Sequence, residues 1–183
     1  MRTSDVDIVI APGIGGGTDE HWYSRWEAKL PTARRIVQAD WDHPTLAAWT
    51  RELVDAVEAA GKPVVLVGHS LGVRTIAHAA DRIAERVVGA FLVAPPAARA
   101  LREIPEIDLA FRDDRATTLP FPAVLVASRD DPYCTYAEAE ALATAWGATL
   151  VDAGTSGHLN HESGHGPWPE GLMRFAGFLK SLS

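Results

Sequence analysis

The chain has 183 residues, of which 47% are hydrophobic and 22% charged, and its 17 Lys and Arg against 24 Asp and Glu give a net charge of −7. This length predicts a single domain, residues 1–183, that folds around one core, and the hydrophobic fraction excludes an intrinsically disordered chain. The negative charge disfavours nucleic acids, acidic polymers and anionic membranes, and we expect none of them as partners.

Short apolar runs separated by turns recur along the chain. Most of them are continuous stretches of Val, Ile and Leu rather than alternating ones, which is typical of strands buried on both faces of a parallel sheet. In chain order, the predicted strands are residues 6–11, 35–39, 63–67, 87–94, 123–127 and 149–151.

Between these runs, hydrophobic residues recur every three or four positions, as they do on one face of a helix. In residues 45–60, Leu46, Trp49 and Leu53 follow this spacing, and Gly61 ends the pattern. Strands that alternate with helices form βαβ units, so we expect the α/β class, with a three-layer α/β/α sandwich around a mostly parallel sheet of about six strands. The predicted helices are residues 21–30, 45–60, 71–84, 136–146 and 168–182.

Residues 95–120 break this alternation, since the segment is charged, interrupted by prolines and without a clear strand. Open α/β sheets bind ligands at the carboxyl ends of their strands, and we expect the segment to lie there as a partial lid or wall. Only about 25 residues are available for it, so no large cap domain is expected.

A Gly-His-Ser-Leu-Gly sequence at residues 68–72 stands between the third predicted strand and the helix that follows it. In a nucleophile elbow, the chain turns so sharply from strand to helix that the residues beside the Ser must be small, and the Ser hydroxyl is exposed. The helix N-terminus then directs free N–H groups at a forming oxyanion. This context favours Ser70 as a nucleophile and the N–H of Leu71 as an oxyanion donor, over a Gly-rich turn in which Ser70 only caps the helix.

A nucleophilic Ser needs a base and an orienting carboxylate, which follow it in the order Ser, acid, His in α/β-hydrolase sheets. Asp130 and Asp131 follow the predicted strand 123–127, and His158 follows the last predicted strand. Asp131 is favoured as the acid because it precedes Pro132, which biases its backbone towards an extended conformation. Asp130 is then a turn-capping residue, and His158 is the expected base.

A glycine-rich loop, residues 12–18, follows the first predicted strand. It lacks the third glycine of a dinucleotide fingerprint and the Lys-Ser/Thr pair of a P-loop, so nucleotide binding is not expected. Such a loop can instead bring a second N–H close to the elbow, and Gly13 or Ile14 is the expected oxyanion donor beside Leu71. A flexible turn before a helix is the alternative explanation of the glycines.

Several other side chains near the predicted site have two interpretations. His21, Trp22 and Trp168 are expected as walls of a substrate pocket, with core packing at helix starts as the alternative. Cys134 lies near the acid loop, where a packed small hydrophobic residue is favoured over a reactive thiol.

Three histidines in one segment, His158, His161 and His165, superficially suggest a metal site together with Glu162. The glycines around them favour a loop, and no H-E-x-x-H pattern exists. We therefore interpret His161 and His165 as polar loop residues, and expect neither a metal nor another cofactor.

Together these motifs resemble those of the small serine hydrolases of the YdeN and retinoblastoma-binding-protein type, a compact branch of the α/β-hydrolase superfamily. The resemblance covers nearly the whole chain: Pro-Gly-x-Gly-Gly-Gly after the first strand, the elbow, Ala-Ser-Arg-Asp-Asp-Pro-Tyr at 127–133, Gly-His-Leu-Asn at 157–160 and Ser-Gly-His-Gly-Pro-Trp-Pro at 163–169. It implies a triad of Ser70, Asp131 and His158, a nearly lidless fold and carboxylesterase-like activity on small esters. Some members are described as interaction proteins, which keeps a binding role open.

The sequence therefore predicts a carboxylesterase-like serine hydrolase that cleaves small acyl esters through a Ser-His-Asp triad and an acyl-enzyme intermediate. Two alternatives stay open: an α/β-hydrolase-fold binding or interaction protein that uses the cleft at the strand ends, and a thioesterase or amidase with the same triad. The expected partner is a small-molecule acyl substrate, with a protein partner left open. The single cysteine, the lack of an apparent signal peptide and the lack of a long apolar run predict a cytoplasmic protein.

Overall fold

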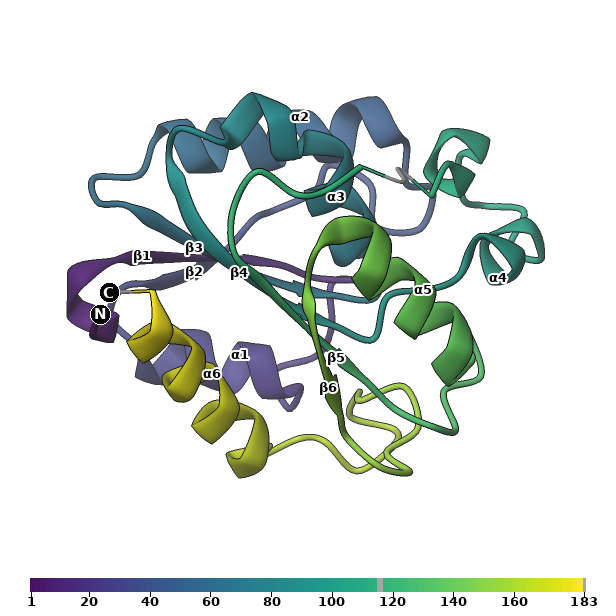
Figure 1. Ribbon diagram of the computed structural model, residues 1–183. Coiled ribbons are helices and arrows are strands. Elements are labelled where there is room, and N and C mark those ends of the chain that lie inside the picture. The colour runs from purple at the N-terminus through teal and green to yellow at the C-terminus, as the bar shows by residue number, and fades with distance from the viewer. Residues whose placement is uncertain (115–116, 183) are drawn as a thin grey trace.

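A fully parallel sheet of six strands forms the centre of the structure, a computed structural model that describes residues 1–114 and 117–182 (Figure 1). The strand order is β2-β1-β3-β4-β5-β6, and every neighbouring pair is parallel. In chain order, the strands are β1 (Asp7–Ala11), β2 (Ala33–Arg35), β3 (Val64–His69), β4 (Val87–Val93), β5 (Ala123–Ala127) and β6 (Thr149–Asp152).

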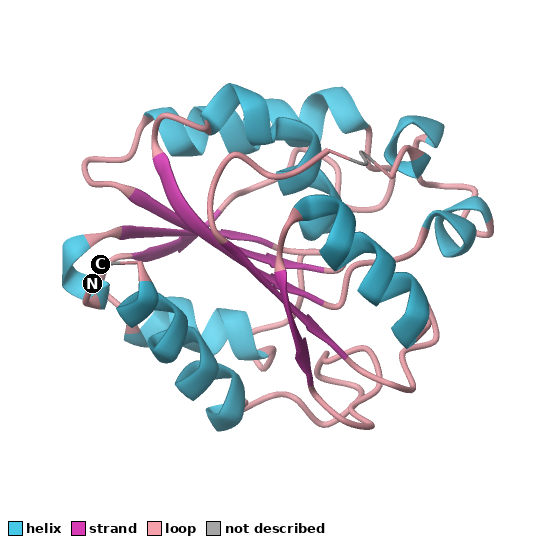
Figure 2. Cartoon of the chain, viewed as in Figure 1, coloured by secondary structure: helices cyan, strands magenta, loops and turns pink. Residues whose placement is uncertain are grey.

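Helices cover both faces of the sheet and complete three layers, which confirms the predicted fold class (Figures 1 and 2). One face carries α1 (Trp22–Lys29) and α6 (Pro169–Ser181), and the other carries α2 (Leu46–Glu58), α3 (Leu71–Ile83) and α5 (Tyr136–Trp146). The described residues also form a short helix, α4 (Ala98–Arg102), and the 3₁₀ turns η1 (Thr3–Asp5) and η2 (Leu109–Arg112). None of these helices has both the length and the apolar composition that crossing a membrane requires.

The strands are apolar on both faces because helices cover both faces. In β1, Ile8 and Ile10 pack into the hydrophobic cluster under α1 and α6, whereas Val9 packs into the cluster under α2, α3 and α5. All three side chains are fully buried. This double burial explains why the strands are continuous rather than alternating apolar runs in the sequence.

The second strand is the one element whose prediction is wrong, since all other predicted strands and helices agree with the structure within two residues. β2 ends at Arg35, where the strand predicted at 35–39 was expected to begin. Ala33 and Arg35 pair with Ile8 and Ile10 at the edge of the sheet. Beyond them Val37 is 75% exposed, so the apolar residues after Arg35 follow the strand rather than form it.

The order of the strands in the sheet reverses at β1. β2 lies on one side of β1, and β3 and all later strands lie on its other side. The loops that follow β1 and β3 therefore separate above the sheet and leave a crevice at its carboxyl end, where ligands bind in sheets of this type. The loop 12–18 follows β1, and Ser70 follows β3.

The segment 95–120 packs over this end of the sheet as a wall; its residues 115 and 116 lie outside the described part of the chain. Arg74 of α3 is fully buried and donates a hydrogen bond from Nε to the carbonyl oxygen of Pro96, at 2.8 Å. A hydrophobic cluster also joins the segment to α2 and α3, and its buried members are Trp49, Leu71, Leu101, Ile107 and Phe111.

Candidate active site

Ser70 occupies a sharp turn between the end of β3 and the start of α3. Its φ of 53° and ψ of −124° form a strained conformation that few non-glycine residues adopt and that projects the side chain out of the turn. A Cβ at Gly68 would lie 2.8 Å from Ile76 of α3, and a Cβ at Gly72 would collide with the carbonyl oxygen of Ala11. Both glycines of the motif are therefore needed for the strand, the turn and the helix to approach this closely.

Gly72→Ala is expected to lower the free energy of unfolding by about 1–3 kcal/mol, because the added methyl group overlaps the backbone that ends β1. Gly177→Ala is the matched control, since a Cβ there meets no atom within 4 Å, and the helix propensity of Ala should raise the free energy of unfolding by about 0.5–1 kcal/mol. Urea unfolding followed by tryptophan fluorescence measures both changes. A Gly72→Ala protein as stable as the wild type would contradict this close packing.

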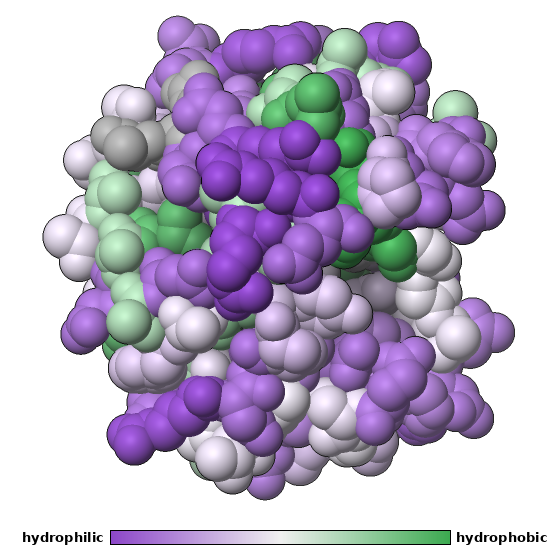
Figure 3. Space-filling view, turned by 90° about the vertical axis from the view of Figure 1, so that its right-hand side faces the viewer, coloured by the Kyte–Doolittle hydropathy of each residue, from purple (hydrophilic) through white to green (hydrophobic). Residues whose placement is uncertain are grey.

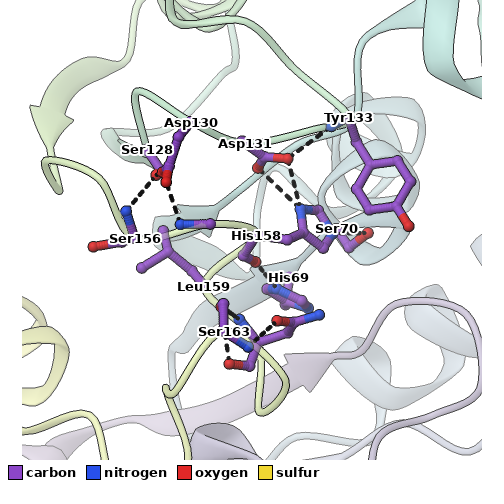
Figure 4. Close-up of polar contacts among 12 residues, drawn as sticks. His69, Ser70, Ser128, Asp130, Asp131, Tyr133, Ser156, His158, Leu159 and Ser163 are labelled. Carbon is purple, nitrogen blue, oxygen red and sulfur yellow. Dashed lines mark hydrogen bonds and ion pairs between the residues drawn. The ribbon is translucent and has the colours of Figure 1, made fainter.

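The structure brings Ser70, His158 and Asp131 together in one hydrogen-bonded chain (Figure 4). His158 Nε2 lies 2.9 Å from Ser70 Oγ, and His158 Nδ1 lies 2.9 and 3.0 Å from the two carboxylate oxygens of Asp131. The Asp131 side chain is only 2% exposed. Because a carboxylate only accepts hydrogen bonds, it holds the proton of neutral His158 on Nδ1 and leaves Nε2 free to accept the proton of Ser70.

The adjacent acid, Asp130, has a different set of contacts. Its Oδ1 accepts hydrogen bonds from Ser128 Oγ at 2.6 Å and from the Gly157 N–H at 2.8 Å. These two donors hold the pKa of Asp130 below its usual value. Since Gly157 directly precedes His158, Asp130 ties the acid loop to the histidine loop. Of these two acids, Asp131 is the one that contacts the imidazole.

Two buried ring systems hold the main chain of the histidine loop. His69 Nε2 donates to the carbonyl oxygen of His158 at 3.0 Å, and Trp22 Nε1 donates to that of Leu159 at 2.9 Å. Burial, together with the nearby His158, keeps the pKa of His69 well below 6.5, so its ring is neutral. His69 therefore supports His158 and is not itself placed as the base.

Backbone N–H groups approach Ser70 from two sides. Leu71 is the first residue of α3, where a helical N–H has no partner within the helix. On the other side, a Cβ built on Gly13 would lie 2.9 Å from the Cβ of Ser70, so the loop after β1 closely approaches the serine. A glycine is needed at this position because any larger residue would meet the side chain of Ser70.

Two backbone N–H groups of the loop after β1 already have hydrogen-bond acceptors. The N–H of Gly15 donates to the carbonyl oxygen of Trp41, and that of Gly16 donates to the carbonyl oxygen of Gly13, each at 3.2 Å. These two N–H groups are therefore occupied. Gly13 and Ile14, the two candidates from the sequence, both line the cavity together with Ser70.

A cavity of about 450 Å³ opens over Ser70 and His158, within the size range of small-molecule sites. Hydrophobic and polar residues meet on this hollowed face of the molecule (Figure 3). Tyr23, close to His21 in the sequence, lines the cavity. The sequence patterns do not single out Tyr133 and Asn160 as lining residues, although each lies beside a predicted site residue or motif. Other residues that line the cavity are Gly13, Ile14, His21, Leu71, Leu101, Ile104, Ile107 and Glu162.

His21 lines this cavity, but Trp22 and Trp168 do not. Trp22 is fully buried and Trp168 is 5% exposed, and their ring centroids lie 5.2 Å apart in the cluster under α1 and α6. The interpretation of these two tryptophans as pocket walls is therefore wrong. Trp22 is the first residue of α1 and Trp168 is the N-cap of α6, and the large ring of each packs towards the sheet.

The other polar side chains of the histidine loop have separate contacts. His161 Nε2 lies 3.1 Å from Glu20, and His165 Nδ1 lies 3.3 Å from Ser163 Oγ. Among the described residues, no group of three His, Cys, Asp or Glu side chains is arranged to hold a metal ion. Cys134 is buried, and burial raises the pKa of its thiol to about 12, so it packs as a small hydrophobic residue.

Two buried neutral histidines should make the protein less stable in mild acid. Burial lowers the pKa of His21 to about 3 and that of His69 well below 6.5. Below about pH 6.5 the unfolded chain binds a proton at each side chain and the folded protein does not, so stability is lost as the pH falls. His21 is expected to lower the free energy of unfolding by about 1.4 kcal/mol per pH unit between about pH 6 and pH 4, and His69 contributes a loss in the same direction.

His21→Phe removes one of these two contributions. Urea unfolding at pH 7, 6, 5 and 4 should therefore give a pH slope that is smaller in His21→Phe than in the wild type by about 1.4 kcal/mol per pH unit. Equal slopes would show that His21 is protonated in the folded protein.

A family model described as serine hydrolase matches residues 8–177. The chain belongs to the serine hydrolase family. No curated protein has a significantly similar sequence.

Three of the solved structures to which this serine hydrolase is similar illustrate the range of identity. A YdeN-like hydrolase from Pectobacterium atrosepticum is 36% identical over 98% of this chain and 94% of that chain, with a TM-score of 0.87. The ydeN gene product from B. subtilis is 21% identical over 97% of this chain and 98% of that chain, with a TM-score of 0.77. Thermogutta terrifontis esterase 2 is 15% identical over 100% of this chain and 86% of that chain, with a TM-score of 0.71. The last two show the fold alone, and the resemblance to YdeN-like hydrolases of the α/β-hydrolase superfamily is confirmed.

Proposed function

We propose that this serine hydrolase cleaves small carboxylic esters through Ser70, His158 and Asp131. The observation that carries the proposal is the hydrogen-bonded chain from Ser70 Oγ through both ring nitrogens of His158 to a buried Asp131, at 2.9 Å on each side. It lies at the floor of a cavity of about 450 Å³, which is large enough for a small acyl substrate.

In the first half of the reaction, Ser70 Oγ attacks the ester carbonyl carbon while His158 Nε2 accepts the serine proton. The carbonyl oxygen becomes an oxyanion, and the positive charge on His158 is stabilised by Asp131. When the tetrahedral intermediate collapses, His158 returns the proton to the departing alcohol oxygen. The products of this half are the free alcohol and an ester between the acyl group and Ser70.

In the second half, a water molecule takes the place of the alcohol. His158 removes one proton from the water as its oxygen attacks the acyl carbon, and the second tetrahedral intermediate expels Ser70 Oγ. The proton then returns from His158 to Ser70. A carboxylic acid leaves, and the protein is restored without any cofactor.

The oxyanion of both intermediates is assigned to the N–H of Leu71 and to the N–H of Gly13 or Ile14. The close approach of Gly13 to Ser70 and the engagement of the Gly15 and Gly16 N–H groups elsewhere support this assignment. Each donor of this kind is worth about 3–4 kcal/mol of transition-state stabilisation.

A fluorophosphonate probe tests the proposal, because it reacts only with a serine that an adjacent base activates. We expect native protein to bind one probe per chain, mass spectrometry to place the adduct on Ser70, and heat-denatured protein to stay unlabelled. A burst of one 4-nitrophenol per chain from a 4-nitrophenyl ester should accompany the labelling. Folded protein that neither reacts nor hydrolyses would favour the binding-protein alternative, and faster cleavage of matched thioesters or anilides would move the substrate class to those acyl compounds.

A further inference from the structure

The cavity over Ser70 has two sides of different chemistry. The first, which we call the apolar side, consists of Leu101, Ile104 and Ile107 from the segment over the sheet, of which Leu101 and Ile107 belong to a hydrophobic cluster with Leu71. The second, the polar side, consists of His21, Tyr23 and Asn160. The polar side is not used by any step of the proposed reaction, so its groups need a separate explanation.

His21 is the most unusual member of the polar side. It is 5% exposed and lines the cavity, yet its Nδ1 is buried and has no hydrogen-bond partner among the described residues. Its ring stacks on that of Tyr23, with centroids 3.7 Å apart. Buried polar atoms nearly always have partners, so this environment is unusual. Nδ1 itself is enclosed by protein, and the small exposed part of the ring is what meets the cavity. Because Nδ1 is unbonded, its contacts do not fix the tautomer, and the proton can reside on the nitrogen that faces a ligand.

The other two members also present neutral hydrogen-bond donors. Burial raises the pKa of Tyr23 well above its usual value, so its hydroxyl keeps its proton. The Oδ1 atom of Asn160 accepts a hydrogen bond from the Ser163 N–H at 3.0 Å, which leaves the side-chain NH₂ as the free end of that amide. The Asn160 Nδ2 and the Tyr23 hydroxyl can therefore both donate hydrogen bonds to a ligand.

The charges of the side chains around the cavity favour a neutral ligand over an anionic one. The burial that keeps the pKa of His21 at about 3 prevents the ring from offering a positive charge near neutral pH. Glu162 also lines the cavity, and the carboxylate repels an anionic group. A neutral oxygen that accepts hydrogen bonds satisfies the donors without meeting this repulsion.

We propose that the polar side is a specificity subsite that binds a neutral amide carbonyl of the substrate, while the apolar side packs against its hydrocarbon part. The inference rests on the proposed ester hydrolysis, and it assigns to that reaction a substrate that carries an amide at some distance from the ester. Binding of the amide places its oxygen at His21 and Tyr23 and thereby orients the ester over Ser70.

Two matched esters test the subsite. In 4-nitrophenyl 4-acetamidobutanoate the acyl chain ends in an amide, and in 4-nitrophenyl 6-methylheptanoate a hydrocarbon of the same shape replaces that amide. The measured quantity is the ratio of kcat/KM for the amide ester to kcat/KM for the hydrocarbon ester. His21→Phe and Tyr23→Phe keep the stacked rings and remove one polar group each, and each should lower this ratio by about 3–10-fold, mainly through KM.

Two further variants distinguish recognition from structure. Ile104→Ala shortens a side chain of the apolar side and should change the ratio in the opposite direction, because it weakens binding of hydrocarbon. His21→Gln retains a donor and should restore part of the ratio lost in His21→Phe. If the polar variants lower kcat/KM for both esters equally and leave the ratio unchanged, His21 and Tyr23 are structural and the subsite is overturned.

The subsite can also be tested if the protein does not hydrolyse esters. If wild-type protein cleaves neither ester and resists the fluorophosphonate, binding of N-butylacetamide can still be followed through the NMR signals of the His21 ring. Saturable shifts that are weakened in Tyr23→Phe support the subsite as a binding site for amides. Signals that do not move overturn it.

Discussion

Ser70→Ala is expected to lower kcat for a small 4-nitrophenyl ester by about 10⁶-fold, because the ester between the acyl group and the protein can no longer form. A residual rate of about 10³–10⁴-fold over water should survive, since the oxyanion donors and the cavity still bind the substrate. Steady-state hydrolysis with highly purified protein measures this loss. A variant that retains about 1% of wild-type kcat would remove Ser70 from the role of nucleophile.

A stability control separates this loss of chemistry from a loss of fold. Ser70 holds φ 53° and ψ −124° in the wild type, a conformation that is strained for any residue with a Cβ. Ser70→Ala keeps the Cβ and should unfold at nearly the same urea concentration. Ser70→Gly relieves the strain and should raise the free energy of unfolding by about 1 kcal/mol, although it is equally inactive.

His158→Ala extends the same test. Residues that act as one unit lose activity together, so Ser70→Ala combined with His158→Ala should be no less active than Ser70→Ala alone. The hydrogen bond of 2.9 Å between Ser70 Oγ and His158 Nε2 is the structural basis of this expectation. A double variant that is a further 100-fold slower would mean that the two side chains act independently.

The elbow and the order of the polar residues could be predicted from the sequence because they depend on short-range rules. Gly68 and Gly72 are needed wherever a strand turns directly into a helix, and both lie within two residues of Ser70. Asp131 and His158 each follow a strand of a parallel sheet, and the carboxyl ends of such strands meet at one edge. Local sequence and sheet topology together therefore bring these side chains to one place.

Long-range contacts explain what the sequence did not reveal. Trp22 resembles a pocket residue in the sequence because it follows His21, yet its Nε1 bonds to the carbonyl oxygen of Leu159, 137 residues away. The orphan Nδ1 of His21 is also invisible in the sequence, since it arises from the side chains that pack around the ring. The second strand was misplaced for a similar reason. The apolar residues after Arg35 indicated a strand, but the chain leaves the edge of the sheet at Arg35, and Val37 is exposed.

Asp131→Asn is expected to lower kcat by about 10⁴-fold while leaving KM within a few fold of the wild type. The Asn side chain has nearly the same shape, but its NH₂ group can donate to His158 Nδ1 and so shift the ring proton to Nε2. A protonated Nε2 cannot accept the proton of Ser70, and the positive imidazolium of the transition state also loses its negative partner. Steady-state and single-turnover hydrolysis of the same 4-nitrophenyl ester measures the loss at the acylation step.

Asp130→Asn is the matched control, because it removes a charge one residue away in the same loop. Its Oδ1 can still accept hydrogen bonds from Ser128 Oγ and the Gly157 N–H, so the histidine loop should keep its position and kcat should fall by less than about 10-fold. A larger loss in Asp130→Asn than in Asp131→Asn would transfer the role of the acid to Asp130. Because the two residues are adjacent and carry the same charge, but Asp131 is the one that reaches the imidazole, the comparison tests contact with His158 rather than the acidity of the loop.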